Sequence, residues 1–254
     1  MAKRISHQDD DPFLKSIALR RDFVPSFDIY PYCIPAIKNL GVLPLHPKVT
    51  FFIGENGTGK STLLEAIAVA DGFNAEGGTR NFNFSTRESH SDLYRILTPV
   101  RGARKARHDS FFLRAESFYN VATMIDQLGL TTDPRSPYGT TSYHEQSHGE
   151  AFLTLFAQRF GGNGLYLLDE PESALSPSRQ LTFLAGLHDL VQRNSQLIIA
   201  THSPIIMAYP NAKILCFTET GIEEVDYEDT DHYKVTKAFM TRTEKMLDDL
   251  MSDD

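Results

Sequence analysis

The sequence of 254 residues has little of several features that mark specialised classes of protein. Its two cysteines, Cys33 and Cys216, are too few for a disulfide framework and indicate reduced thiols. The longest unbroken apolar runs, 66–70 and 205–209, are too short to cross a bilayer. The first twelve residues carry basic side chains with no apolar core behind them, so they predict no secretory signal. These absences predict a globular protein of the reducing cytoplasm.

Internal repeats and heptad runs are also missing, which excludes a solenoid and a long coiled-coil arm. A content of 17 Phe and 10 Tyr excludes disorder of the whole chain. The net charge of −8 lies in residues 218–254, where twelve acidic side chains face four basic ones, and this tail predicts a solvated surface. Residues 78–114 reverse the sign, with three acidic side chains against eight basic ones: Arg80, Arg87, Arg95, Arg101, Arg104, Lys105, Arg107 and Arg114. This basic stretch predicts contact with DNA or a protein effector, or a solvated loop whose arginines pair with acidic neighbours.

Short apolar strands alternate with helices along the chain, which predicts a mostly parallel sheet covered by helices on both faces. The expected strands are 16–20, 32–37, 49–53, 111–113, 165–168 and 197–200. The expected helices are 62–70, 117–128, 150–160, 178–192 and 233–251. We expect one domain over 1–254, with an inserted lobe at about 71–160 and a C-terminal helix with an acidic tail at 233–254.

The strongest motif is GENGTGKS at residues 54–61, which follows an expected strand and precedes an expected helix. Its glycines let the chain wrap closely around phosphates, and backbone N–H groups of the loop and helix start then point at the anion. Lys60 would reach the β- and γ-phosphates, and the Ser61 hydroxyl would ligate Mg²⁺. The motif therefore predicts a nucleotide-binding loop rather than an ordinary glycine turn.

Polar residues follow two of the expected buried strands. Asp169 ends the strand 165–168, and its carboxylate can hold Mg²⁺. Glu170 comes next and is placed to take a proton from an attacking water. His202, after the strand 197–200, can contact a γ-phosphate or hold that water. The alternatives are a surface Asp-Glu pair and a polar loop histidine.

Residues 147–150, SHGE, combine a helix-starting Ser147 with Gly149, which permits close backbone approach to phosphate. The alternative is a plain helix cap. Residues 144–148, HEQSH, also match the H-E-x-x-H motif of zinc proteases. Because the helix should begin at Ser147, the two histidines would not share a helix face, which argues against such a site.

Together GENGTGKST, SHGE, LLDEPESALS and ATHSP resemble the ATP-binding cassette (ABC) ATPases, and more narrowly the SMC/RecF-like bacterial AAA family ATPases. The phrases RNFNFSTR, FFLRAESF, HEQSHGE and HYKVTKAF extend the resemblance over nearly the whole chain. It implies an α/β P-loop fold of the ABC type with N-terminal antiparallel strands and a small helical lobe. It also implies ATP and Mg²⁺ as cofactors, and a head-to-tail dimer with two ATP molecules in the interface.

The resemblance assigns roles to single residues. The implied catalytic residues are Lys60, Glu170, as the catalytic glutamate, and His202, as the switch histidine, while the metal ligands are Ser61 and Asp169. The signature residues Ser147 and Gly149 would contact ATP held by the other subunit. The implied nucleotide-binding loop comprises Gly54, Glu55, Asn56, Gly57, Thr58, Gly59, Lys60, Ser61 and Thr62.

Several positions depart from the family pattern. SHGE replaces LSGGQ, which argues against a transporter subunit, and Ser176 replaces the usual D-loop aspartate. Glu116 is the nearest candidate for the Q-loop residue, and no aromatic residue is clearly placed to stack on adenine. The sequence also lacks the guanine-reading N-K-x-D motif, which favours ATP over GTP.

The sequence therefore predicts an Mg²⁺-dependent ATPase that dimerises on ATP and acts in DNA maintenance or phage defence. One alternative is an ATP-gated regulatory subunit that controls a toxin or nuclease partner. Another is the nucleotide-binding subunit of a transporter. We expect no direct contact with a membrane.

Overall fold

A six-stranded sheet forms the centre of the protein in a computed structural model, which describes residues 11–79, 91–103, 109–130, 136–139 and 142–252. The strand order is β5-β6-β7-β3-β8-β9, with β9 antiparallel to β8 and every other pair parallel. The strands are β3 (Val49–Gly54), β5 (Asp109–Arg114), β6 (Gly164–Asp169), β7 (Gln196–Ala200), β8 (Lys213–Phe217) and β9 (Ile222–Glu224). Because parallel strands end at one edge, the loops after β3, β6 and β7 open side by side.

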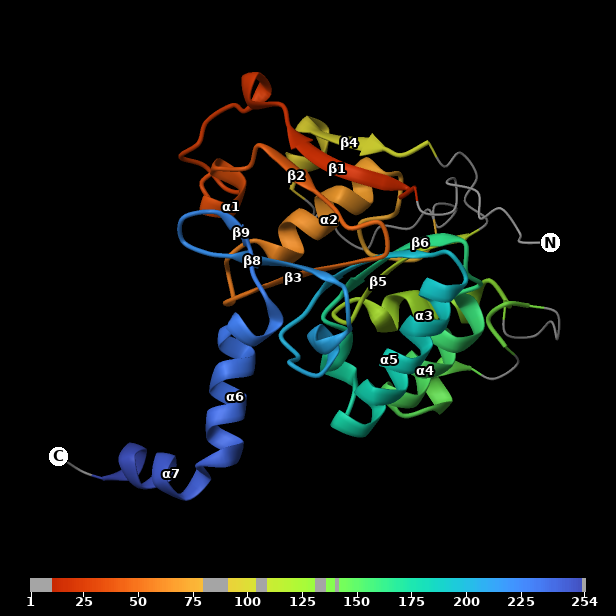
Figure 1. Ribbon diagram of the computed structural model, residues 1–254. Coiled ribbons are helices and arrows are strands. Elements are labelled where there is room, and N and C mark those ends of the chain that lie inside the picture. Colours follow the sequence, from red (N-terminus) through yellow and green to blue (C-terminus); the bar gives the residue numbers. More distant parts are fainter. Residues whose placement is uncertain (1–10, 80–90, 104–108, 131–135, 140–141, 253–254) are drawn as a thin grey trace, which may run out of the picture.

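A smaller antiparallel sheet, of order β2-β1-β4, lies over one face of the main sheet (Figure 1). Its strands are β1 (Leu14–Leu19), β2 (Val42–Pro44) and β4 (Leu97–Arg101). The helix α2 (Lys60–Ala70) packs between the two sheets, and the short α1 (Pro35–Lys38) lies beside it. Most of α2 is buried, and β3 lies in the centre of the main sheet, so the loop between β3 and α2 is held at both of its ends.

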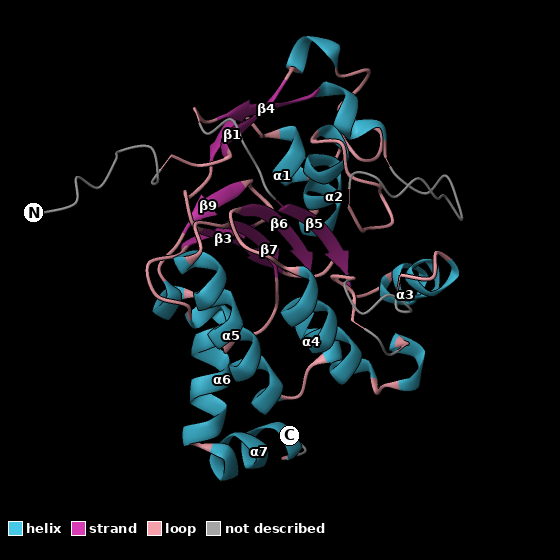
Figure 2. Ribbon diagram, turned by 90° about the vertical axis from the view of Figure 1, so that its right-hand side faces the viewer, coloured by secondary structure: helices cyan, strands magenta, loops and turns pink. Residues whose placement is uncertain are grey.

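Three helices cover the opposite face of the main sheet: α3 (Phe118–Gln127), α4 (His148–Arg159) and α5 (Pro177–Gln192) (Figures 1 and 2). Aromatic rings fill the space between them and the sheet. The rings of Phe156 and Phe183 lie 4.7 Å apart, and Phe160 stacks on Tyr166 of β6 at 4.5 Å. This aromatic layer connects α4 and α5 to the strand that carries Asp169.

Side chains on the central strands alternate between two cores. Phe52 and Leu167 face α2 and the small sheet, whereas Phe51 and Leu168 face α3, α4 and α5. Since both faces of the sheet are covered, these strands are apolar throughout. This explains why they read as unbroken apolar runs in the sequence.

The C-terminal part of the chain forms two helices, α6 (Asp231–Thr241) and α7 (Thr243–Met251), which project away from the sheets (Figure 1). None of their side chains is buried. The expectation of a single helix over 233–251 is wrong, because Arg242 leaves the helical region at φ −137° and ψ 37°. Within the described residues, no helix combines the length and apolarity needed to cross a membrane.

The mostly parallel sheet, its helices on both faces and the N-terminal antiparallel strands confirm the predicted fold class. The strand expected at 32–37 is wrong. Pro35 opens helix α1 there, because its fixed φ suits the first helical position. Residues 71–160 contribute β4 and β5 to the two sheets as well as the helices α3 and α4. Five of the eight basic residues of 78–114 lie outside the described residues: Arg80, Arg87, Arg104, Lys105 and Arg107.

Candidate active site

The loop between β3 and α2 depends on three glycines with positive φ: Gly54 (133°), Gly57 (80°) and Gly59 (97°). A Cβ atom at Gly54 would lie 2.4 Å from the carbonyl oxygen of Phe217. At Gly59 it would lie 2.8 Å from the Ile34 side chain. The loop can therefore keep this shape only with glycine at these positions.

Lys60 is 4% exposed and points back into the loop. Its ammonium donates to the carbonyl oxygens of Gly54 at 2.7 Å and Glu55 at 2.9 Å. Burial lowers the pKa of Lys60, while the carboxylates of Glu170 and Asp169 act in the opposite direction. A buried cation enclosed by backbone fits an anionic ligand such as a phosphate chain.

Ser61 and Asp169 meet at the end of β6, where the Ser61 hydroxyl donates to Asp169 Oδ1 at 2.8 Å. Burial raises the pKa of Asp169, while Arg114 and the Ser61 hydroxyl act to lower it. A hydroxyl beside a carboxylate supplies the oxygen ligands that Mg²⁺ prefers. No group of three or more His, Cys, Asp or Glu in the described ranges could hold a metal, so phosphate and water would have to complete the coordination.

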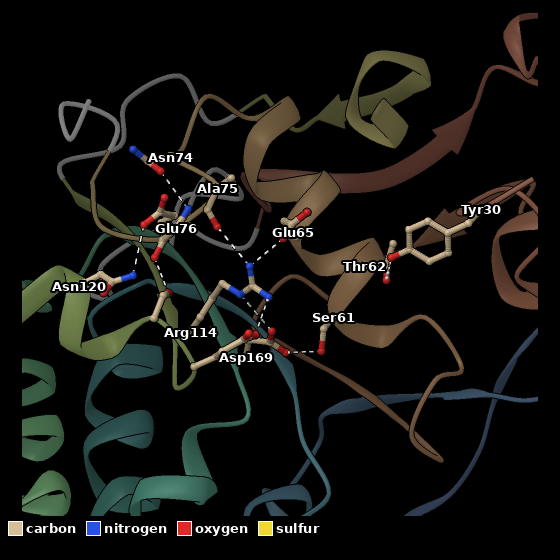
Figure 3. A network of polar contacts seen from close by, with 12 residues as sticks. Tyr30, Ser61, Thr62, Glu65, Asn74, Ala75, Glu76, Arg114, Asn120 and Asp169 are labelled. Carbon is tan, nitrogen blue, oxygen red and sulfur yellow. Dashed lines mark hydrogen bonds and ion pairs between the residues drawn. The ribbon is translucent and has the colours of Figure 1, made fainter. Parts of the chain in front are cut away.

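Arg114, at the end of β5, joins the Asp169 carboxylate to helix α2 (Figure 3). Its guanidinium lies 2.7 Å from Glu65, 3.3 Å from Glu116 and 3.5 Å from Asp169. In the sequence, Arg114 stood out only as a member of the basic stretch. The signal that the sequence offered is an arginine directly after an apolar strand, since a half-buried cation needs acidic partners.

Glu170 and His202 face each other across the ends of β6 and β7. Glu170 has a left-handed backbone, φ 51°, and its Oε1 lies 3.8 Å from His202 Nε2. That nitrogen is buried and has no hydrogen-bond partner among the described residues. Glu172 accepts the backbone N–H of His202, and His232 Nε2 lies 3.3 Å from His202 Nδ1. An unpartnered nitrogen beside a carboxylate suits a polar ligand such as a phosphate oxygen or a water.

Two clefts border the loop. The first, of about 480 Å³, is lined by Ser61, Ala115, Glu116, His148, Asp169, Glu170, Ser173 and Ala174. The second, of about 450 Å³, is lined by Pro35, Ile53, Gly54, Glu55, Asn56, Gly57, Thr58, Cys216, Phe217, Thr218, Glu219, Asp231 and His232. The first cleft thus brings together Ser61, Asp169 and Glu170, and Glu116, the candidate for the Q-loop residue, also lines it.

The expected signature residues, Ser147 and Gly149, lie at the start of α4, and His148 between them lines the first cleft. Glu150 accepts from both the backbone N–H and the hydroxyl of Ser147, so Ser147 also acts as a helix cap. Gly149 is packed so closely that a Cβ would lie 2.6 Å from the Ala174 carbonyl oxygen. His144 lies in a separate 3₁₀ turn, so it does not share a helix with His148, as the sequence analysis expected.

Each described arginine of the basic stretch has an acidic partner. Arg95 pairs with Asp92 and Arg101 with Asp71, as Arg114 does with Glu65 and Asp169. For these three arginines, the contacts agree with the alternative to DNA or effector binding, in which the arginines pair with acidic neighbours.

Tyr30 is an aromatic residue near the loop that the sequence analysis did not single out. Its hydroxyl lies 3.4 Å from the Thr62 hydroxyl, and the residue is 66% exposed (Figure 3). It lies on an irregular segment 32 residues before Thr62, where no periodic pattern could have indicated the contact.

Comparison with known proteins gives one matching family, described as "AAA domain, putative AbiEii toxin, Type IV TA system", over residues 49–137 and 127–208. This span contains all of the motifs described above. Curated relatives include the ABC transporter G family member STR2 of Medicago truncatula, 27% identical over 61% of this chain and 24% of that protein. The molybdate import ATP-binding protein MolC of Haemophilus influenzae is 30% identical over 64% of this chain and 65% of its own length. The chain thus spans about a quarter of the plant transporter.

Solved structures with a similar fold include the SMC head domain from Thermotoga maritima, at 16% identity and a TM-score of 0.48 over 84% of this chain and 99% of that one. A putative metal-chelate type ABC transporter in an inward-facing conformation matches at 18% identity and a TM-score of 0.49, over 89% and 88% of the two chains.

Proposed function

The chain belongs to this AAA-domain family of ABC-type P-loop ATPases, which bind and hydrolyse ATP, and we propose how its own residues perform that reaction. The observation that carries the proposal is the meeting of three loops at one sheet edge. The nucleotide-binding loop follows β3, Asp169 and Glu170 follow β6, and His202 follows the intervening β7.

In this proposal the loop N–H groups and Lys60 bind the phosphates, and Ser61 and Asp169 hold Mg²⁺. The bound ion would neutralise charge on the β- and γ-phosphate oxygens. Glu170 accepts the proton of the attacking water, and His202 Nε2 contacts the γ-phosphate. Catalysis is then mostly positioning and charge stabilisation.

Two variants test these roles. Lys60→Ala should lose ATP binding, because it removes the buried cation of the loop. Glu170→Gln keeps the shape and removes the base, so it should retain binding and lose turnover. His188→Ala, on the exposed face of α5, is the matched control and should behave as wild type. Phosphate release and equilibrium ATP binding are measured on the same preparations; normal turnover by Glu170→Gln would overturn its assignment as the base.

We further propose that ATP joins two copies of the chain head to tail, with Ser147 and Gly149 of one copy on the ATP of the other. Support comes from the resemblance of SHGE to the family's signature motif and from its place at the start of α4. Light scattering of Glu170→Gln with ATP and Mg²⁺ should show a dimer, and Glu170→Gln/Ser147→Ala should not. A persistent monomer at micromolar concentration contradicts the proposal.

The whole chain, in this proposal, works as one cytoplasmic ATPase domain in DNA maintenance or phage defence, with α3 and α4 as its helical lobe. The family description, which names a toxin–antitoxin system, supports a second candidate, an ATP-gated regulator of a toxin or nuclease. A burst of hydrolysis without steady turnover, or turnover only with an added partner, would favour the regulator. Copurification with a membrane protein would instead favour a transporter subunit.

A further inference from the structure

His232, the second residue of α6, touches the proposed switch histidine at the ring nitrogen that faces away from Glu170. We propose that His232 is a positioning residue for hydrolysis, which fixes the tautomer of His202 and connects the γ-phosphate contact to the projecting helix α6. This inference rests on the proposed ATPase site. Neither the motifs nor the family resemblance assigned a role to His232.

Burial lowers the pKa of His202 and of His232, which favours the neutral form of each ring. A neutral imidazole carries one N–H and one acceptor nitrogen, so one ring must donate across the 3.3 Å contact. The other nitrogen of His202, Nε2, lies 3.8 Å from a Glu170 carboxylate oxygen, which only accepts. Electrostatics therefore place a proton on His202 Nε2, and His232 Nε2–H donates to His202 Nδ1.

This tautomer is the one that the proposed reaction needs. Phosphate oxygens accept hydrogen bonds and donate none, so a useful contact requires an N–H at His202 Nε2. Without the donor on His232, the His202 ring could protonate at Nδ1 and present a lone pair to the phosphate. His232 acts through His202 and not on the nucleotide's reacting atoms.

Further contacts join the segment after β7, which carries His202, to the segment before α6. The Tyr227 hydroxyl donates to the Pro204 carbonyl oxygen at 2.9 Å, and the Thr230 hydroxyl lies 3.8 Å from the Met207 sulfur. The Thr230 hydroxyl also accepts the Tyr233 N–H at 3.2 Å, which caps α6. The segment after β7 and the segment before α6 are therefore joined at two points besides the His202–His232 contact. Asp231 and His232 also line the second cleft, whereas the rest of α6 and α7 projects away from the sheets (Figure 1).

A kinetic series tests the tautomer assignment. His232→Ala should lower kcat by about tenfold to a hundredfold and change ATP affinity by less than about threefold, because the lost contact acts on a transition-state group. His232→Gln should recover most of the rate, since its amide N–H can occupy the place of the imidazole Nε2–H. His232→Asn, one carbon shorter, should not recover it, and the His188→Ala control should keep the wild-type rate.

Hydrogen–deuterium exchange tests the connection to α6 without turnover. In a Glu170→Gln background, ATP with Mg²⁺ should slow exchange at the first turn of α6 more than ADP with Mg²⁺ does. Adding His232→Ala should remove this difference while the nucleotide-binding loop remains protected. A structural role alone would change exchange equally with either nucleotide.

Three outcomes distinguish failure of the proposed ATPase function from failure of the role proposed for His232. If none of the variants, nor the wild type, binds ATP, the proposed function fails. If ATP binds and His232→Ala keeps the wild-type kcat, the positioning role is overturned. If His232→Ala loses rate but α6 exchanges alike with ATP and ADP, the connection to the helix is overturned.

Discussion

Removal of the Arg114 charge should destabilise the protein more than removal of any exposed arginine. Arg114 is 16% exposed in its side chain, and its partners Glu65 and Asp169 are 11% and 8% exposed. Arg114→Met keeps the aliphatic stem and removes the cation that two buried carboxylates share. Breaking a buried ion pair costs about 3–5 kcal/mol, and we expect about 3 kcal/mol because some water can reach the site.

Thermal unfolding measures this loss. For a protein of this size, about 3 kcal/mol lowers Tm by about 6–12 °C. Arg95→Met is the matched control, because Arg95 and Asp92 form an exposed pair at 3.2 Å and such pairs contribute little to stability. Adding Glu65→Gln to Arg114→Met should restore part of the stability, since only one of the two carboxylates then keeps its charge. A Tm shift of Arg114→Met no larger than that of Arg95→Met would refute the reasoning.

The same variant should respond to pH. Burial already raises the pKa of Asp169, and Arg114 opposes that rise, so Arg114→Met raises this pKa further. A carboxyl group with a raised pKa in the folded state loses stability as pH rises through that pKa. The deficit of Arg114→Met should therefore be larger at pH 8 than at pH 5, which urea unfolding at the two pH values can measure.

Three other predictions concern the site and its surroundings. His202→Ala should lower kcat on the order of tenfold to a thousandfold with little change in ATP affinity, and equal loss of both would show a binding or folding role instead. Gly54→Ala should abolish ATP binding, measured by calorimetry, because its Cβ would meet the Phe217 carbonyl oxygen at 2.4 Å; wild-type affinity would contradict the cradle geometry. If the basic stretch binds DNA, affinity should fall steeply with salt, and the slope should flatten on joint replacement of Arg101, Arg104, Lys105 and Arg107. No binding at low salt, with or without ATP, would favour a protein partner.

Much of the fold could be predicted because its signals are local. Apolar runs end at motif residues, and strands that alternate with helices form a parallel sheet whose ends share one edge. That rule predicts Lys60, Asp169 and His202 at the same edge of the sheet. The break in the C-terminal helix at Arg242 was not predicted, because no proline or glycine marks it. Helix α1 was predicted as a strand, because a short apolar segment fits either a strand or a helix.

The sequence by itself determined the nucleotide-binding loop, the strands that carry the acidic residues and the family. Only the tertiary structure decided that Arg114 shares its charge between Glu65 and Asp169, and that His232 meets His202 from 30 residues away. Periodicity and motif spacing report backbone geometry over a few residues, whereas these contacts depend on how whole elements pack. A histidine at the start of an exposed helix has the same sequence signature whether it faces solvent or a catalytic side chain, and the contact of His232 with the loop after β7 distinguishes the two.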